Sequence, residues 1–294
     1  MEQLFDHSLL RQRRERALAR LEPDADFLIR RVAEDMAERL MVVERLFEAP
    51  VQVHGGLPLA ADLMQASGKT AEFRFVDTCP VPGKNTKATR LASPDLVPLE
   101  PQSADLVVSP LALHLTNDTP GVLVQLRRSL KPDGLLLAAT PGAGTLGELR
   151  EALLAAESEL TGGANARIHP FGDVRDYGAL LQRAGFALPV TDIEEVVVRY
   201  SDMFALLRDL RAMGMTSLLT ERSRTPLTKS VFLRAAEIYA ERFSDPDGRI
   251  RASFPIVHLS GWAPHESQQK PLKPGSAKQR LSDVLKTPEQ KLPR

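Results

Sequence analysis

The feature that most constrains the fold is a series of short apolar segments that alternate with helical stretches. Four segments have the length and the β-branched or leucine-rich composition of strands: Ala49–Val53, Glu72–Val76, Asp105–Ser109 and Leu135–Ala139. Between them, helical periodicity covers Pro58–Ser67 and Thr119–Leu130. Strands that alternate with helices predict an α/β protein with a largely parallel sheet.

The rest of the chain adds helices at both ends of this pattern. Further helices are expected at Leu146–Glu159 and Val174–Ala184, and further strands at Ile193–Tyr200 and Phe254–Gly261. Apolar stripes predict two inserted helices at Met203–Met213 and Ser230–Phe243. Before the first strand, two amphipathic helices separated at Pro23 are expected to cover an edge of the sheet or flank a pocket, with their paired charges facing solvent.

Composition argues against several classes of partner. Lysine plus arginine and aspartate plus glutamate number 38 each, so no global charge favours nucleic acid or an anionic membrane. A basic stretch begins at Lys270, and a solvated tail explains it equally well. The single cysteine, Cys79, excludes an internal disulfide and predicts a cytoplasmic location. No segment resembles a signal peptide or reaches the roughly 20 apolar residues of a transmembrane helix.

Several motifs together resemble the central block of class I S-adenosylmethionine-dependent methyltransferases. Asp105 opens an apolar strand, Leu113-His114-Leu115 and Asn117-Asp118 follow it, and Lys131-Pro132-Asp133-Gly134 precedes the next strand. Motifs outside this block are similar to the methyltransferase-like assembly factor of respiratory complex I: Phe5-Asp6, Gly162-Gly163, His169-Pro170-Phe171, Gly261-Trp262 and His265-Glu266-Ser267-Gln268. The central domain also resembles the carrier-protein methyltransferase of biotin synthesis.

This resemblance implies a Rossmann-like class I methyltransferase fold, with a mostly parallel sheet and an antiparallel last strand. Five parts are then expected: N-terminal helices over 1–48, the Rossmann-like domain over 49–200, a helical cover over 201–246, the last strand over 247–265 and an extended basic tail over 266–294. The helical cover is expected to lie over the rim of the cofactor pocket and to enclose the substrate.

The loop after the first strand departs from the Gly-x-Gly-x-Gly pattern of this superfamily. Gln52 takes the acidic position, His54 the first glycine, Gly56 the second and Pro58 the third. Glycines there allow positive φ and close approach of the backbone to a ligand. Two interpretations remain: a modified cofactor site that uses Gly55 and Gly56, or a lost site on a fold kept for binding partners.

Other positions that match the family's cofactor site follow later strands. Asp77 ends the second strand 21 positions after Gly56, near the spacing of about 20 at which this fold presents an acid to ribose hydroxyls. Ser93 stands where the family tends to have an acid, and Asp95 is either its substitute or a turn residue. The predicted residues that bind S-adenosyl-L-methionine are Val53, His54, Gly55, Gly56, Asp77, Ser93, Asp95 and Ser109.

His114 is the candidate catalytic residue, because it lies just beyond the fourth strand where substrates enter such sheets. The alternative is a structural histidine hydrogen-bonded to a nearby loop. The histidines show no metal-binding spacing, so no metal is predicted.

The resemblance implies a methyltransferase-like protein that acts on a protein or acyl-carrier substrate, with a respiratory complex I subunit as the candidate. Hydroxylation of an arginine on such a subunit and a non-enzymatic assembly or chaperone role are the alternatives. A nicotinamide oxidoreductase is disfavoured, because no Gly-x-Gly-x-x-Gly follows the first strand. Cofactor binding distinguishes an enzyme from a scaffold.

Overall fold

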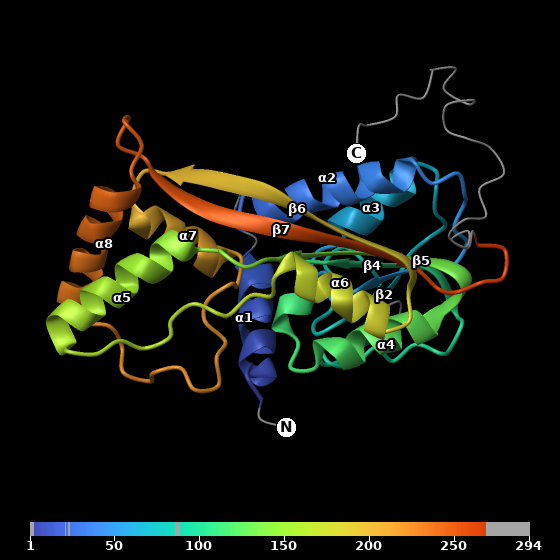
Figure 1. Ribbon diagram of the computed structural model, residues 1–294, viewed down its shortest axis with the longest axis horizontal. Helices are drawn as coiled ribbons and strands as arrows, with labels where there is room; N and C mark the ends of the chain where they lie inside the picture. Colours follow the sequence, from blue (N-terminus) through green and yellow to red (C-terminus); the bar gives the residue numbers. More distant parts are fainter. Residues whose placement is uncertain (1–2, 21, 23, 86–88, 269–294) are drawn as a thin grey trace, which may run out of the picture. The chain divides into compact units, whose positions relative to one another are not determined.

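The computed structural model describes residues 3–20, 22, 24–85 and 89–268, and these residues form a seven-stranded sheet (Figure 1). The strand order is β3-β2-β1-β4-β5-β7-β6. The strands are β1 (Pro50–Val53), β2 (Arg74–Asp77), β3 (Thr89–Leu91), β4 (Ala104–Pro110), β5 (Leu130–Pro141), β6 (Ala187–Tyr200) and β7 (Ile250–Trp262). Only β7 pairs antiparallel with its neighbours, β5 and β6. The expected methyltransferase-like sheet with an antiparallel last strand is confirmed.

Helices cover both faces of the sheet. They are α1 (His7–Arg20), α2 (Phe27–Met41), α3 (Leu59–Ala66), α4 (Thr119–Ser129), α5 (Gly147–Thr161), α6 (Val174–Arg183), α7 (Met203–Ala212) and α8 (Lys229–Phe243), with a short 3₁₀ turn, η2 (Leu113–Leu115). In Figure 1, α2 and α3 lie on one face, and α4 and α6 lie on the other. Alternate residues of β4 serve the two layers: Leu106 packs with α2 and α3, and Val107 packs with α4 and α6.

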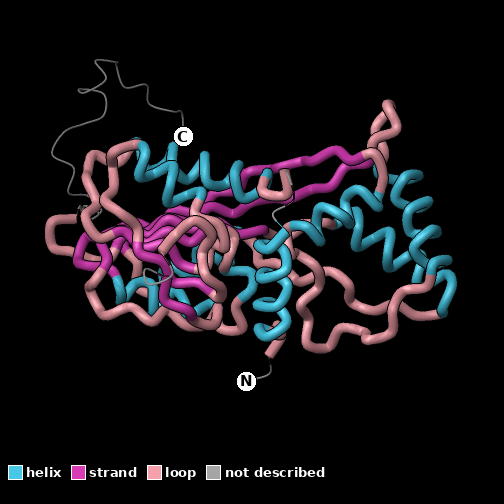
Figure 2. Tube along the Cα trace, turned by 180° about the vertical axis from the view of Figure 1, so that it is seen from behind, coloured by secondary structure: helices cyan, strands magenta, loops and turns pink. Residues whose placement is uncertain are grey.

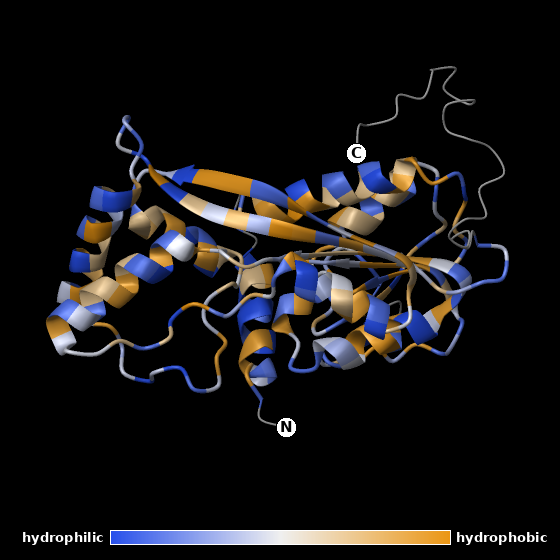
Figure 3. Ribbon diagram, in the orientation of Figure 1, coloured by the Kyte–Doolittle hydropathy of each residue, from blue (hydrophilic) through white to orange (hydrophobic). Residues whose placement is uncertain are grey.

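The outer strands β6 and β7 extend well beyond the other strands, toward α5, α7 and α8 (Figure 1). In this extension β7 no longer pairs with β5 and pairs only with β6, for example at Ala252 and Val198. Apolar residues of the extension and the helices form one core, in which Phe254 and Tyr239 are fully buried. The hydrophobic colouring in Figure 3 follows the strands and the inward faces of these helices.

Several boundaries differ from the sequence prediction, and those of β5 and β6 have a clear cause. β5 begins at Leu130 directly after α4, so the residues expected to form a turn before it belong to the strand. Among them, Asp133 has a left-handed φ of +60°. β6 begins at Ala187 and not at Ile193, because cross-strand hydrogen bonding to β7 holds the earlier residues extended. Of the predicted tail over 266–294, residues 269–294 lie outside the described residues.

None of the helices in the described part of the chain has the length and apolar composition needed to cross a bilayer.

Candidate cofactor and substrate site

A cavity of about 900 Å³ lies at the carboxyl ends of the parallel strands. Its walls include the Gly55–Leu57 loop after β1, His114 in η2 and the start of α5. Residues of α1, α7 and α8 close it. In Figure 2, α1 is the helix nearest the N-terminus, and it lies between the main part of the sheet and the other helices that close the cavity. The inserted helices therefore line the same cavity as Gly55 and Gly56. Their role as a substrate cover stays a prediction.

The first two strands bring Gly56 and Asp77 together. β1 and β2 are adjacent and parallel, with Val53 opposite Val76, so Asp77 leaves the sheet beside the loop after β1. The backbone N–H of Gly56 donates to Asp77 Oδ2 over 2.7 Å. Gly56 has a φ of +73°, which explains the need for glycine, and a Cβ there would meet nothing within 4 Å. The predicted meeting of Gly56 and Asp77 is thus observed, and their place on a cofactor pocket stays a prediction.

Asp77 has a second partner, Arg14, which the sequence analysis missed. Arg14 Nη1 lies 3.0 Å from Asp77 Oδ1, and its other nitrogen donates to the backbone oxygen of His54 over 3.2 Å. The side chain of Asp77 is only 2% exposed and does not line the cavity, whereas Arg14 does. The prediction that the charges of the first helix face solvent is wrong for Arg14, because α1 packs across the strand ends.

Gln52 holds the loop after β1 in place through side-chain hydrogen bonds. Its side chain is buried, donates to the Leu57 oxygen over 2.8 Å and accepts from the Ala61 N–H over 3.2 Å. A Cβ on Gly55 would lie 2.4 Å from Gln52 Nε2, so only glycine fits there. Gln52 therefore fixes the loop onto the first turn of α3, and its amide is fully engaged in doing so.

His54 bridges the loop after β1 and the turn after β3. Its backbone is left-handed, with a φ of +57°, and its ring is buried with Nε2 3.1 Å from the Leu96 oxygen. Burial lowers the pKa of His54, so the neutral ring donates its Nε2–H to that oxygen. Its Nδ1 is buried and has no hydrogen-bond partner among the described residues.

Ser93 and Asp95 lie in the turn after β3 and make contacts with α1 and with the loop before α4. Ser93 Oγ is 3.0 Å from His7 Nδ1. Asp95 Oδ1 accepts from the N–H groups of Asn117 and Asp118 over 2.7 and 3.1 Å. Asp95 thus joins the turn after β3 to the loop before α4, which is a long-range contact and not the local turn role that was expected. Its predicted contact with a cofactor stays a prediction.

His114 lies in η2 and lines the cavity. Its ring stacks at a tilt on Phe171, with 5.9 Å between ring centroids. Burial holds the pKa of His114 well below its usual range, so the imidazole is neutral at physiological pH. Its Nδ1 has no hydrogen-bond partner in the described part of the chain. Val53 and Ser109, the remaining predicted residues, are buried within or at the ends of β1 and β4.

His169 is a second buried imidazole on the cavity wall, beyond the predicted site residues. Its Nε2 accepts from the Leu218 N–H over 2.7 Å, and Phe5 packs edge-on against its ring. Burial lowers the pKa of His169 to about 4. The sequence signal was present, since His169-Pro170-Phe171 is one of the motifs shared with the assembly factor.

Comparison with known proteins places this geometry in a family. A model of the methyltransferase domain matches residues 63–138. The arginine-hydroxylase NDUFAF5 of Danio rerio is 36% identical over 291 residues, which cover 96% of this chain and 90% of the relative. The chain belongs to the NDUFAF5 family of methyltransferase-fold proteins. Against the NDUFAF5 of Dictyostelium discoideum, identity is 44% over 190 residues, which span only 43% of that protein.

Two further similarities place NDUFAF5-like chains among class I methyltransferases. The malonyl-[acyl-carrier protein] O-methyltransferase of Laribacter hongkongensis is 31% identical over 287 residues, covering 92% of this chain and 94% of the relative. Among solved structures, a putative methyltransferase from Bacillus halodurans superposes with a TM-score of 0.51 at 14% identity, covering 78% of this chain and 99% of that one. The second similarity shows the fold alone.

Proposed function

We propose that this NDUFAF5-like protein is an arginine hydroxylase that acts on a respiratory complex I subunit and binds S-adenosylmethionine beside its substrate cavity. The observation that carries the proposal is the rim of Gly56 and Asp77 next to a cavity that α1, α7 and α8 enclose. The relatives that are 35 to 36% identical over nearly the whole chain are named arginine hydroxylases, which supports the reaction, and the relative named a methyltransferase is 31% identical. A cytoplasmic location stays a prediction.

The rim has the chemistry that the cofactor requires. Asp77 is a carboxylate beside Gly56 that could accept from ribose hydroxyls once Arg14 is displaced, and Gly56 leaves open space where a side chain would stand. When bound, S-adenosylmethionine supplies an electrophilic methyl group on its sulfonium. Hydroxylation is a different reaction, because it inserts an oxygen atom and needs an oxidant and two electrons from outside the chain.

The cavity also offers carboxylates to a cationic substrate. Glu22 and Asp24, near the loop between α1 and α2, line it and are exposed. Carboxylates bind guanidinium groups through paired, charge-assisted hydrogen bonds. The cavity wall also carries five arginines: Arg13, Arg14, Arg30, Arg167 and Arg211. An arginine substrate would therefore compete with them for these acids.

We expect cofactor binding to be weak, because the loop is degenerate in both sequence and contacts. His54 places a ring where the family has glycine and fixes it on the Leu96 oxygen. Arg14 holds Asp77 Oδ1, so the ribose hydroxyls must displace a guanidinium. The engaged state of Asp77 also favours the second candidate function, a non-enzymatic assembly scaffold.

Mass spectrometry of complex I tests the proposed function. Complex I is purified from cells that lack this gene and are complemented with the wild-type protein or with Asp77→Ala. The expected result is one arginine that gains a single oxygen atom with the wild type and stays unmodified without the gene. A gain of one methyl group on this arginine would show that the protein transfers a methyl group and does not hydroxylate. Assembly restored without any modified arginine would establish the scaffold.

Removing Arg14 tests whether it competes with the cofactor. Arg14→Ala is expected to strengthen binding of S-adenosylmethionine by about tenfold, because Asp77 Oδ1 then keeps only its Thr78 donors and the ribose has no guanidinium to displace. The same change is expected to lower the stability of the free protein by about 3 kcal/mol, because a buried carboxylate loses its counter-charge. Calorimetric titration and thermal unfolding measure the two effects.

Arg11→Ala, on an exposed side chain of the same helix, should change neither. Weaker binding by Arg14→Ala would instead make Arg14 a cofactor ligand.

A further inference from the structure

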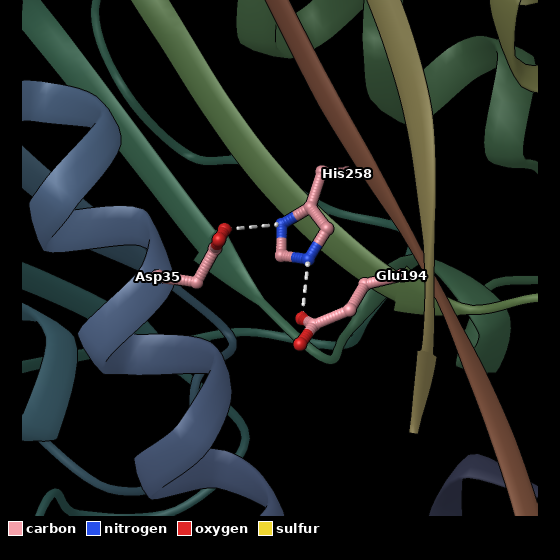
Figure 4. Close-up of side chains that lie close together, drawn as sticks. All are labelled: Asp35, Glu194 and His258. Carbon is pink, nitrogen blue, oxygen red and sulfur yellow. Dashed lines mark ion pairs between the residues drawn. The ribbon is translucent and has the colours of Figure 1, made fainter. Parts of the chain in front are cut away.

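A second polar cluster lies away from the cavity, between α2 and the two outer strands. It consists of Asp35 from α2, Glu194 from β6 and His258 from β7, whose side chains point toward one another in Figure 4. Each residue offers one possible ligand atom, and these atoms lie within 4.8 Å of one another. The side chain of His258 is 2% exposed, and those of the two acids are about one quarter exposed.

The buried imidazole of His258 lacks hydrogen bonds. Asp35 Oδ2 is 3.1 Å from Nδ1 and Glu194 Oε2 is 3.6 Å from Nε2, yet neither nitrogen makes a hydrogen bond of good geometry with any described residue. Glu194 Oε2 is also buried without a hydrogen-bond partner in the described chain. A neutral imidazole has one N–H, so at least one of its nitrogens turns a lone pair toward a carboxylate. Buried acceptors that face each other are costly unless a cation lies between them.

The surrounding charges leave the cluster negative. Arg31 pairs with Glu194, and Arg39 pairs with both Asp35 and Asp192. Three carboxylates therefore share two guanidinium groups.

We propose that Glu194 and His258, with Asp35, bind a divalent transition-metal ion of the zinc class. The 3.6 Å between His258 Nε2 and Glu194 Oε2 is too long for a hydrogen bond. It is close to the separation of about 3.4 Å between two ligand atoms on a tetrahedral zinc. Imidazole with carboxylate is a donor set that suits zinc and its neighbours. Asp35 faces Nδ1 on the other side of the ring, so it supplies the carboxylate that orients the ring.

The ion would join α2 to β6 and β7 where β7 still pairs with β5, so its role is structural and separate from the cavity. The expectation of no metal rested on histidine spacing in the sequence. Spacing carries no information here, because the three residues come from three elements that meet only in the folded sheet.

Metal titration of tag-free protein, first dialysed against a chelator, tests the site. One equivalent of Zn²⁺ is expected to bind with micromolar or tighter affinity and to raise the unfolding temperature. Co²⁺ in its place should give the visible absorption of a tetrahedral ion. Glu194→Gln, which preserves size, and His258→Ala should each abolish this binding, and Asp35→Asn should weaken it ten- to hundredfold.

Glu195→Gln is the matched control, since Glu195 is the exposed neighbour on the same strand. It should bind zinc as the wild type does. If His258→Ala fails to fold, Glu194→Gln and the metal-dependent unfolding temperature of the wild type decide the question. Absence of binding in the wild type at hundreds of micromolar zinc would overturn the proposal. So would equal binding by the wild type and Glu194→Gln.

Discussion

Asp77→Ala is expected to weaken S-adenosylmethionine binding tenfold to a hundredfold in a calorimetric titration. A carboxylate that accepts from two ribose hydroxyls contributes on the order of 1.5 to 3 kcal/mol, and Asp77 is the carboxylate at the rim beside Gly56. Asp77→Asn should lie between the wild type and Asp77→Ala, because an amide still accepts one hydrogen bond. Equal affinity in the wild type and both variants would show that S-adenosylmethionine does not bind at Asp77.

The loop gives the complementary experiment. His54→Gly combined with Pro58→Gly gives the loop a Gly-x-Gly-x-Gly pattern, and it should strengthen binding, because it removes the ring that reaches the Leu96 oxygen. The left-handed backbone at His54 suits glycine, so the change does not strain the loop. No heat of binding at millimolar ligand, in the wild type or in this variant, would show that the rim is not a cofactor site and would favour the scaffold.

Stability is expected to fall steeply as the pH drops from about 6.5 toward 4. Burial lowers the pKa of His169 to about 4, so over this window the unfolded chain binds a proton that the folded chain does not. The difference from the usual value of about 6.5 amounts to about 3 kcal/mol of lost stability by pH 4. The lowered pKa of His114 acts in the same direction. Above pH 6.5 both rings are neutral in both states, so this contribution is fully present.

Urea unfolding at pH 7 and pH 5 measures the effect. His169→Gln retains an acceptor for the Leu218 N–H, and its stability loss between the two pH values should be smaller by about 2 kcal/mol. His265→Gln, at an exposed side chain, should behave as the wild type. An unchanged pH dependence in His169→Gln would show that another group causes the acid sensitivity.

The sequence alone determined the local conformations and the class of fold. Apolar runs and helical stripes predicted the strands and helices, because side-chain periodicity reports which face of an element is buried. The spacing of Gly56 and Asp77 predicted their meeting, since a strand–helix–strand unit has one handedness and places both at the same edge. Boundaries such as the start of β6 escaped prediction, because the neighbouring strand decided them.

Only the tertiary structure decided which charged and polar groups meet. Arg14 reaches Asp77 across 63 positions of sequence, and on its own helix it cannot be told from the exposed Arg11. Periodicity separates a buried face from an exposed one, but it does not identify what covers that face. The contacts of His258 likewise depend on how α2 crosses the β6–β7 pair. Such contacts arise from the packing of distant elements, where desolvation and counter-charges set the pKa and hydrogen bonding of each group.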